Sequence, residues 1–162
     1  MGARSQDQTD GLRSLGKSGM QMVAERPLPD ILEVFPNRYP DRFYIINFSF
    51  PEFTSLCPVT GQPDFGTIEI YYIPDQYCVE SKSFKLYMFA FRNYQSFMET
   101  ITNTILDDLV KVMNPCWIRV NGLFAPRGAV NIHVFAEKTK DLSAERNAML
   151  EKTVQNWRME PK

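Results

Sequence analysis

The chain has 162 residues, of which 44% are hydrophobic and 13% aromatic, enough for one domain with an ordinary core. Eighteen Lys and Arg residues against 19 Asp and Glu give a net charge of −1. This balance disfavours a protein that coats nucleic acid through a surplus of cations. No run approaches the roughly 20 apolar residues that cross a bilayer. The composition therefore excludes a collagen, a coiled coil, a membrane span and a wholly disordered chain.

Cysteine and histidine usage narrows the class of site. Cys57, Cys78 and Cys116 are an odd number and widely spaced, which argues against a disulfide framework and for the reducing cytoplasm. His133 is the only histidine. Zinc usually takes three or four Cys, His or carboxylate ligands, so a structural zinc site is not expected.

The first 29 residues differ from the rest of the chain. Residues 1–29 mix Gly, Ser and Gln with alternating charges and carry few apolar side chains. Such a composition cannot offset the entropy lost on ordering. We expect a disordered or expression-derived tail at 1–29 and one folded domain at 30–162.

The first half of that domain predicts two strands. Residues 43–50 are aromatic and β-branched, and Pro51 begins a turn-rich loop that runs through residues 57–64. Residues 65–73 then alternate between apolar and polar side chains, which indicates a second strand with one buried face.

The second half predicts two helices, a hairpin and a terminal helix. Residues 81–93 are rich in aromatics, but apolar side chains at i, i+3, i+4 and i+7 favour a helix. Ser96 and Glu99 have the spacing of a capping box, and the helix they begin ends at Asn114-Pro115. Residues 116–124 and 129–136 read as a hairpin, and 141–162 as a charged helix that docks peripherally.

This order of elements predicts an α+β fold. Two strands, two helices and two strands make one antiparallel sheet with both helices on one face. The sheet has open edges, which are hazards unless they are covered or paired. We therefore expect edges to join between subunits, closing an oligomeric barrel.

Cys57 and Asp64 are the first candidates for chemistry. Cys57 lies in a loop bounded by Pro and Gly, where it is either an incidental cysteine or a reactive thiol. Asp64 follows seven residues later. The loop could bring its carboxylate back to the thiol, or Asp64 is simply a turn residue.

Two further segments allow a binding role beside an ordinary one. Glu80-Ser81-Lys82-Ser83-Phe84-Lys85 places a cap-type serine and two lysines at a helix start, which could hold a phosphate or be a solvated first turn. Arg127-Gly128 gives a weaker hint of the same kind. Glu99 is either the acid of the capping box or a carboxylate that accepts hydrogen bonds from a planar heterocycle.

Several motifs together carry a resemblance. SLCPVTGQPDF, YYIPDQYCVESKSFKLYMFAFRN and LFAPRG follow one another in order between residues 37 and 136. They resemble the single-domain QueF nitrile reductases, the NADPH-dependent 7-cyano-7-deazaguanine reductases of queuosine biosynthesis. The resemblance implies the tunnelling fold, whose subunits form ring oligomers, commonly decamers of two stacked pentamers, with active sites at subunit interfaces.

The resemblance also implies roles for individual residues. Cys57 matches the nucleophile and Asp64 the proton donor. The remaining matches are to substrate at Val79, Glu80, Ser81, Met98 and Glu99, and to NADPH at Ser81, Lys82, Lys85, Arg127 and Gly128.

One position departs from the family. The residue before the anchoring glutamate is usually histidine there, and it is Met98 here. Methionine is only a weak acceptor and does not change charge near neutral pH, so any imidazole role is missing.

Other functions remain open on the sequence. A related enzyme of this fold adds ammonia to the same nitrile, but the ESKSFK segment favours a reductase. A zinc-dependent pterin enzyme lacks its ligands, and a non-catalytic binder of a purine-like ligand would need only Glu99. In the reductase, Cys57 is expected to form a covalent thioimide that NADPH reduces.

Overall fold

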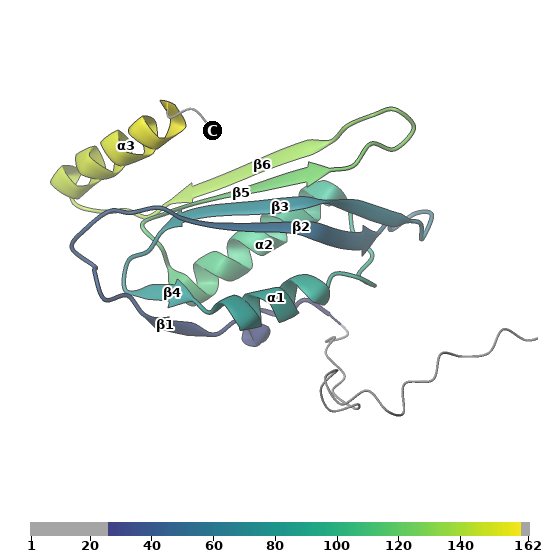
Figure 1. The fold of residues 1–162 in the computed structure, drawn as a ribbon, viewed down its shortest axis with the longest axis horizontal. Coiled ribbons are helices and arrows are strands. Elements are labelled where there is room, and N and C mark those ends of the chain that lie inside the picture. The colour runs from purple at the N-terminus through teal and green to yellow at the C-terminus, as the bar shows by residue number, and fades with distance from the viewer. Residues whose placement is uncertain (1–25, 160–162) are drawn as a thin grey trace, which may run out of the picture.

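A computed structural model describes residues 26–159 and has one antiparallel sheet with two helices on one face (Figure 1). The four strands of the sheet lie in the order β2-β3-β5-β6. Helices α1 and α2 cover the same face of the sheet, which confirms the α+β arrangement. The elements are β2 (Ile46–Leu56), β3 (Pro63–Ile73), α1 (Ser81–Phe89), α2 (Met98–Met113), β5 (Trp117–Phe124) and β6 (His133–Thr139).

The core lies between the sheet and these helices. In β3 the buried side chains are Ile68, Ile70 and Tyr72, the alternate residues of the predicted strand. From α2, Ile101 and Ile105 are fully buried against them, at the i, i+4 spacing of one helix face. The alternating side chains of β3 and the one-sided apolar side chains of α2 therefore pack into one continuous core.

Helix α1 is shorter than predicted and is capped differently. It ends at Phe89 rather than near Asn93. The N-cap is Glu80, whose carboxylate accepts hydrogen bonds from the backbone N–H groups of Lys82 (2.9 Å) and Ser83 (2.7 Å). The prediction of Ser81 as the cap was wrong, because Ser81 is the first helical residue.

The edge strand β2 is longer than predicted. It continues past Pro51 to Leu56, with a register shift against β3 between Phe50 and Phe53. Proline is tolerated at such an irregularity on an edge strand, where no ladder N–H is needed. Strand β3 likewise begins at Pro63, so Asp64 belongs to a strand rather than to a loop.

A small second sheet was not predicted. Strands β1 (Val34–Pro36) and β4 (Tyr77–Val79) pair antiparallel, and a 3-10 helix, η1 (Pro29–Ile31), precedes them. Strands of three residues carry too little alternation to be recognised in a sequence. The predicted tail falls mainly on residues 1–25, which lie outside the described residues, and Pro27 is already buried.

The β5–β6 hairpin has a tight turn ahead of β6. Arg127 and Val130 exchange backbone hydrogen bonds of 3.1 and 3.0 Å around Gly128 and Ala129. Both turn residues have positive φ, 54° at Gly128 and 66° at Ala129. Strand β6 therefore starts at His133 rather than at Ala129 as predicted.

Helix α3 (Ala144–Met159) packs on the other face of the sheet, at one end (Figure 1). Leu150 and Val154 are buried there against Ile73 and Trp117, which confirms the predicted peripheral helix as far as Met159. No helix within residues 26–159 is long and apolar enough to cross a membrane.

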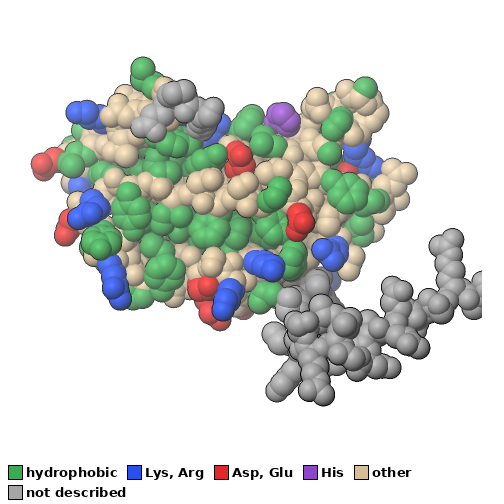
Figure 2. Space-filling view, in the orientation of Figure 1, with side chains coloured by type: hydrophobic (Ala, Val, Ile, Leu, Met, Phe, Trp, Pro, Cys, Tyr) green, Lys and Arg blue, Asp and Glu red, His purple; other side chains and the backbone are tan. Residues whose placement is uncertain are grey.

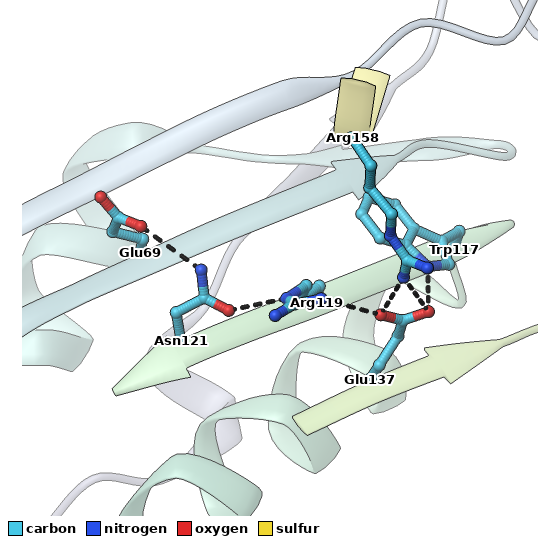
Figure 3. A network of polar contacts seen from close by, with 6 residues as sticks. All are labelled: Glu69, Trp117, Arg119, Asn121, Glu137 and Arg158. Carbon is cyan, nitrogen blue, oxygen red and sulfur yellow. Dashed lines mark hydrogen bonds and ion pairs between the residues drawn. The ribbon is translucent and has the colours of Figure 1, made fainter. Parts of the chain in front are cut away.

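A chain of polar contacts runs across the face of the sheet on which α3 packs (Figure 3). It leads from Glu69 through Asn121 and Arg119 to Glu137, whose carboxylate accepts from Arg158 of α3 at 2.6 and 2.8 Å. Trp117 Nε1 donates to the same carboxylate at 2.9 Å. These contacts fix α3 on the sheet.

Candidate active site

The predicted catalytic pair, Cys57 and Asp64, meets three of the predicted binding residues at one end of the sheet. The end of β2, the start of β3, the first turn of α2 and the β5–β6 turn enclose a cavity of about 340 Å³. It is lined by Cys57, Pro58, Asp64, Ser96, Phe97, Met98, Glu99, Arg127 and Ile132.

A short backbone pairing brings α2 to Cys57. Leu56, the last residue of β2, accepts a hydrogen bond from Ser96 N–H (3.1 Å) and donates its own N–H to Tyr94 (3.0 Å). These bonds hold residues 94–96 extended beside the strand. Helix α2 consequently starts at Met98. Its N-cap residue is Phe97, whose side chain makes no capping hydrogen bond. The predicted capping box of Ser96 and Glu99 was wrong.

Cys57 sits at the start of a closed turn. Its N–H donates to the carbonyl of Gln62 (2.8 Å), and its carbonyl accepts from the N–H of Gly61 (2.9 Å). Gly61 has φ +67°, and a Cβ there would meet nothing within 4 Å. The backbone conformation, not lack of space, therefore favours glycine at this position.

This turn lowers the pKa of the Cys57 thiol. Hydrogen bonds from the Thr60 hydroxyl, then from the backbone N–H groups of Thr60 and Val59, and then from Arg127 lower the pKa of Cys57 to about 6. Burial, by contrast, raises the pKa of both Cys78 and Cys116. All three cysteines are free thiols, and Cys57 is the one poised to ionise near neutral pH.

Asp64 is almost completely buried beside this turn. Its side chain is 3% exposed, and its Oδ1 forms an ion pair with Arg127 Nη1 at 2.8 Å. That ion pair is the one polar contact of Oδ1 within residues 26–159. Arg127 Nη2 also donates to Gln62 Oε1 at 3.1 Å, so Arg127 joins the β5–β6 turn to the β2–β3 turn.

Met98 and Glu99 line the cavity from the first turn of α2. Glu99 is exposed and its carboxylate has no hydrogen-bond or ion-pair partner in the described part of the chain. It is therefore available to a ligand. Met98 is 6% exposed and packs into the core as well as lining the cavity, so it is both a structural and a site residue.

The other predicted binding residues lie elsewhere. Val79, Glu80, Ser81, Lys82 and Lys85 do not line this cavity, and β4, which leads into α1, lies toward the opposite end of the sheet (Figure 1). The Glu80 carboxylate already occupies the N–H groups of the first turn of α1. Of the two interpretations of this segment, the occupied N–H groups favour the ordinary N-cap, and a phosphate there would depend on the side chains of Ser81, Lys82 and Lys85.

Sequence reasoning missed several residues that contact or flank Cys57, Asp64 and Arg127. Thr60 and Gln62 surround the thiol and the guanidinium, and Ser55, paired with Asp64 across the strands, has a buried hydroxyl with no partner within residues 26–159. Thr60 follows Cys57 by three residues, the spacing of a side-chain cap on a turn, and that spacing was the available signal.

No metal site competes with this cavity in the described part of the chain. Residues 26–159 contain no group of three His, Cys, Asp or Glu side chains that could hold a metal ion.

Comparison with known proteins identifies the family. Residues 63–143 match the family model described as QueF-like protein. The chain is 61% identical to the NADPH-dependent 7-cyano-7-deazaguanine reductase of Desulfovibrio desulfuricans, over 99% of this chain and 97% of that protein. It is 48% identical to the enzyme of the same name from Bacillus subtilis, over 86% of this chain and 84% of that protein.

A solved structure agrees at the level of the fold. The crystal structure of the archaeosine synthase QueF-Like in the apo form is similar with a TM-score of 0.56 and 19% identity. The similarity covers 60% of this chain and 96% of that one. With its sequence and its fold matched over these lengths, this chain belongs to the QueF family.

Proposed function

We propose that the chain is an NADPH-dependent 7-cyano-7-deazaguanine reductase, which converts the nitrile to an aminomethyl group in queuosine biosynthesis. Two relatives that carry this name are about 60% identical to the chain, and the match covers nearly their full length. The observation that carries the proposal is the cavity in which a thiol of lowered pKa, Cys57, lies with Asp64 and Glu99.

Cys57 is the nucleophile in this proposal. A nitrile carbon is a modest electrophile, and a thiolate is the strongest nucleophile among protein side chains. The sulfur bonds to the nitrile carbon and one carbon–nitrogen π bond breaks, which gives a thioimide on Cys57. Asp64, once it has taken up a proton from the thiol or from solvent, delivers it to the nitrogen, so the addition is balanced.

Glu99 is the group that orients the substrate. Its free carboxylate at the cavity wall can accept hydrogen bonds from the N–H groups of a deazaguanine ring. Met98, beside it, presents an apolar surface to the ring. Together they hold the nitrile at the end of the cavity where Cys57 lies.

NADPH, when bound, supplies the hydride for each of the two reductions. Lys82 and Lys85 are exposed, and neither forms an ion pair in the described part of the chain. This free positive charge fits a cofactor phosphate. Ser81 would add a hydroxyl, and Arg127 with Gly128 a contact from the β5–β6 turn.

The cavity residues and the lysines lie on different parts of one chain, which supports a site completed by a second copy. Strands β2 and β6 are the unpaired edges of the sheet. Figure 2 shows many hydrophobic side chains across the exposed surface on the side of β2 and α1. We place the enzyme in the cytoplasm as a homo-oligomer, a decamer of two pentamers.

The absorbance of NADPH on addition of 7-cyano-7-deazaguanine tests the proposal. We expect oxidation of two molecules of NADPH for each nitrile, because the nitrile passes through an imine before the amine. Formation of an amidine from ammonia without NADPH oxidation would assign the chain to the other chemistry. Tight binding with neither reaction would leave a non-catalytic binder.

A further inference from the structure

The charges around Cys57 pose a problem for its ionisation. Asp64 of β3 and Glu99 of α2 line the same cavity as the sulfur, and a neighbouring anion opposes the formation of a thiolate. Among the residues that line the cavity, Arg127 on the β5–β6 turn is the one cation. Its placement therefore decides whether the sulfur and Asp64 can be charged together.

The guanidinium of Arg127 reaches both sides of that pair. Nη1 lies 2.8 Å from Asp64 Oδ1, while Nη2 lies 3.1 Å from Gln62 Oε1 and 3.5 Å from Thr60 Oγ1. A planar fork with several donors can make these contacts at once, and a single ammonium cannot. Arg127 thus connects Asp64 with the turn that carries Cys57.

Thr60 carries part of the effect of Arg127 to the sulfur, in addition to the contact that Arg127 itself makes with Cys57. Its Oγ1 accepts from the N–H of Gln62 at 3.3 Å and from Arg127 Nη2 at 3.5 Å. With both of these donors pointing at the oxygen, its own O–H is left to donate. The acceptor for that hydrogen is the sulfur of Cys57.

We propose that Arg127 is a positioning residue for Cys57: it neutralises Asp64 beside the sulfur and orients the Thr60 hydroxyl as a donor to the thiolate. The role is additional to the cofactor contact that family resemblance gives Arg127. It rests on the proposed function only in taking Cys57 as the nucleophile.

Alkylation of Cys57 by iodoacetamide as a function of pH tests the inference. The rate follows the thiolate, and mass mapping of the modified peptide separates Cys57 from the two buried cysteines. We expect a midpoint near 6 in the unaltered protein. In Arg127→Gln the midpoint should rise by at least about one pH unit, because an opposite charge shifts a pKa by one to three units.

Three further variants and one control separate the two parts of the role. Thr60→Val should also raise the midpoint, and the double variant should raise it by less than the sum, because Arg127 acts partly through Thr60. Arg127→Lys should lie between the unaltered protein and Arg127→Gln, since it keeps the charge and loses the fork. Arg38→Gln, at an exposed position away from the cavity, should leave the midpoint unchanged.

Defined results would overturn the inference. An unchanged midpoint in Arg127→Gln with a raised KM for NADPH would make Arg127 a cofactor contact alone. If Arg127→Gln fails to fold by circular dichroism, Thr60→Val and Arg127→Lys decide, and unchanged midpoints in both contradict the proposal. Alkylation needs neither nitrile nor NADPH, so a failure of the proposed reductase activity would be seen separately.

Discussion

The reactivity of Cys57 comes from the turn that follows it rather than from its neighbours in the core. Hydroxyl and backbone donors of Thr60 and Val59 converge on the sulfur, while Cys78 and Cys116 are buried, which favours the neutral thiol. The sequence predicted a thiol in a Pro- and Gly-bounded loop. It could not predict the direction of the donors, because these depend on the positive φ of Gly61 and on a contact from Arg127, distant in the chain.

Replacement of Glu99 tests its role in binding. Because Glu99 caps nothing with its side chain, Glu99→Ala should change the free energy of unfolding by no more than about 0.5 kcal/mol, as for other exposed positions. It should weaken nitrile binding by about 2–3 kcal/mol, since ring N–H groups lose a charged acceptor. Calorimetric titration and denaturant unfolding measure the two effects.

Glu99→Gln is the matched control. It keeps an acceptor oxygen and loses the charge, so its affinity for the nitrile should lie between those of the unaltered protein and Glu99→Ala. Intact affinity in Glu99→Ala, with a loss confined to stability, would return Glu99 to a structural role.

Substitutions of Met98 test the effect of methionine in place of the family histidine. The protein should reduce the nitrile as it stands, and Met98→His should alter the pH profile of kcat/KM by adding a group that titrates near neutrality. Met98→Leu controls for packing, because Met98 is 6% exposed and a swap of similar volume costs less than about 1.5 kcal/mol. Superimposable profiles for Met98→His and Met98→Leu between pH 5 and 9 would mean that imidazole has no titrating role here.

At the scale of elements, local patterns predicted the existence of each long element and failed at the ends. Apolar periodicity placed α1, α2 and β3 correctly, because their buried faces follow from spacing alone. The capping box failed because the backbone of residues 94–96 pairs with Leu56, a contact between distant parts of the chain. That same backbone pairing places the first turn of α2, and with it Glu99, beside the cavity that holds Cys57. The sequence pattern gave no sign of this pairing.

The β5–β6 turn offers a test of local strain. Ala129 adopts φ +66°, a conformation that costs an L-residue with a Cβ roughly 1–2 kcal/mol. Ala129→Gly should therefore raise the free energy of unfolding by about 0.5–1 kcal/mol, once the greater freedom of glycine in the unfolded chain is counted. Denaturant unfolding monitored by circular dichroism measures the change.

The same substitution in a helix should have the opposite sign. Ala148 is exposed in the second turn of α3, where Ala148→Gly should lower the free energy of unfolding by about 0.5–1 kcal/mol. A loss of stability in both variants would show that the turn is not strained at Ala129.

At the scale of the molecule, the residues of the proposed site lie in two separate regions of each chain. Cys57, Asp64 and Glu99 line the cavity, while Lys82 and Lys85 lie on the helix that follows β4. Motifs identified both groups, but a linear sequence does not show which copy of the chain each group serves. The edges at β2 and β6 have no strand partner within the sheet, and the proposed oligomer would let a neighbouring copy supply the other group.

Mixed oligomers test this division. Cys57→Ala and the double variant Lys82→Ala/Lys85→Ala should each lack NADPH oxidation when pure. Unfolding and reassembly of an equal mixture should restore about a quarter of the activity per site, because an intact cavity then meets intact lysines of a neighbour at random. No recovery from mixtures whose native mass shows that they have assembled would place both groups of residues in one chain.

The covalent intermediate is the centre of the account, and intact mass spectrometry measures it most directly. Incubated with 7-cyano-7-deazaguanine and no NADPH, the protein should gain the mass of one substrate molecule, and peptide mapping should place it on Cys57. Cys57→Ala should bind the nitrile without forming the adduct, and Asp64→Asn should form it more slowly because an amide cannot relay the proton. An adduct on Cys78 or Cys116, or full turnover by Cys57→Ala, would contradict the account.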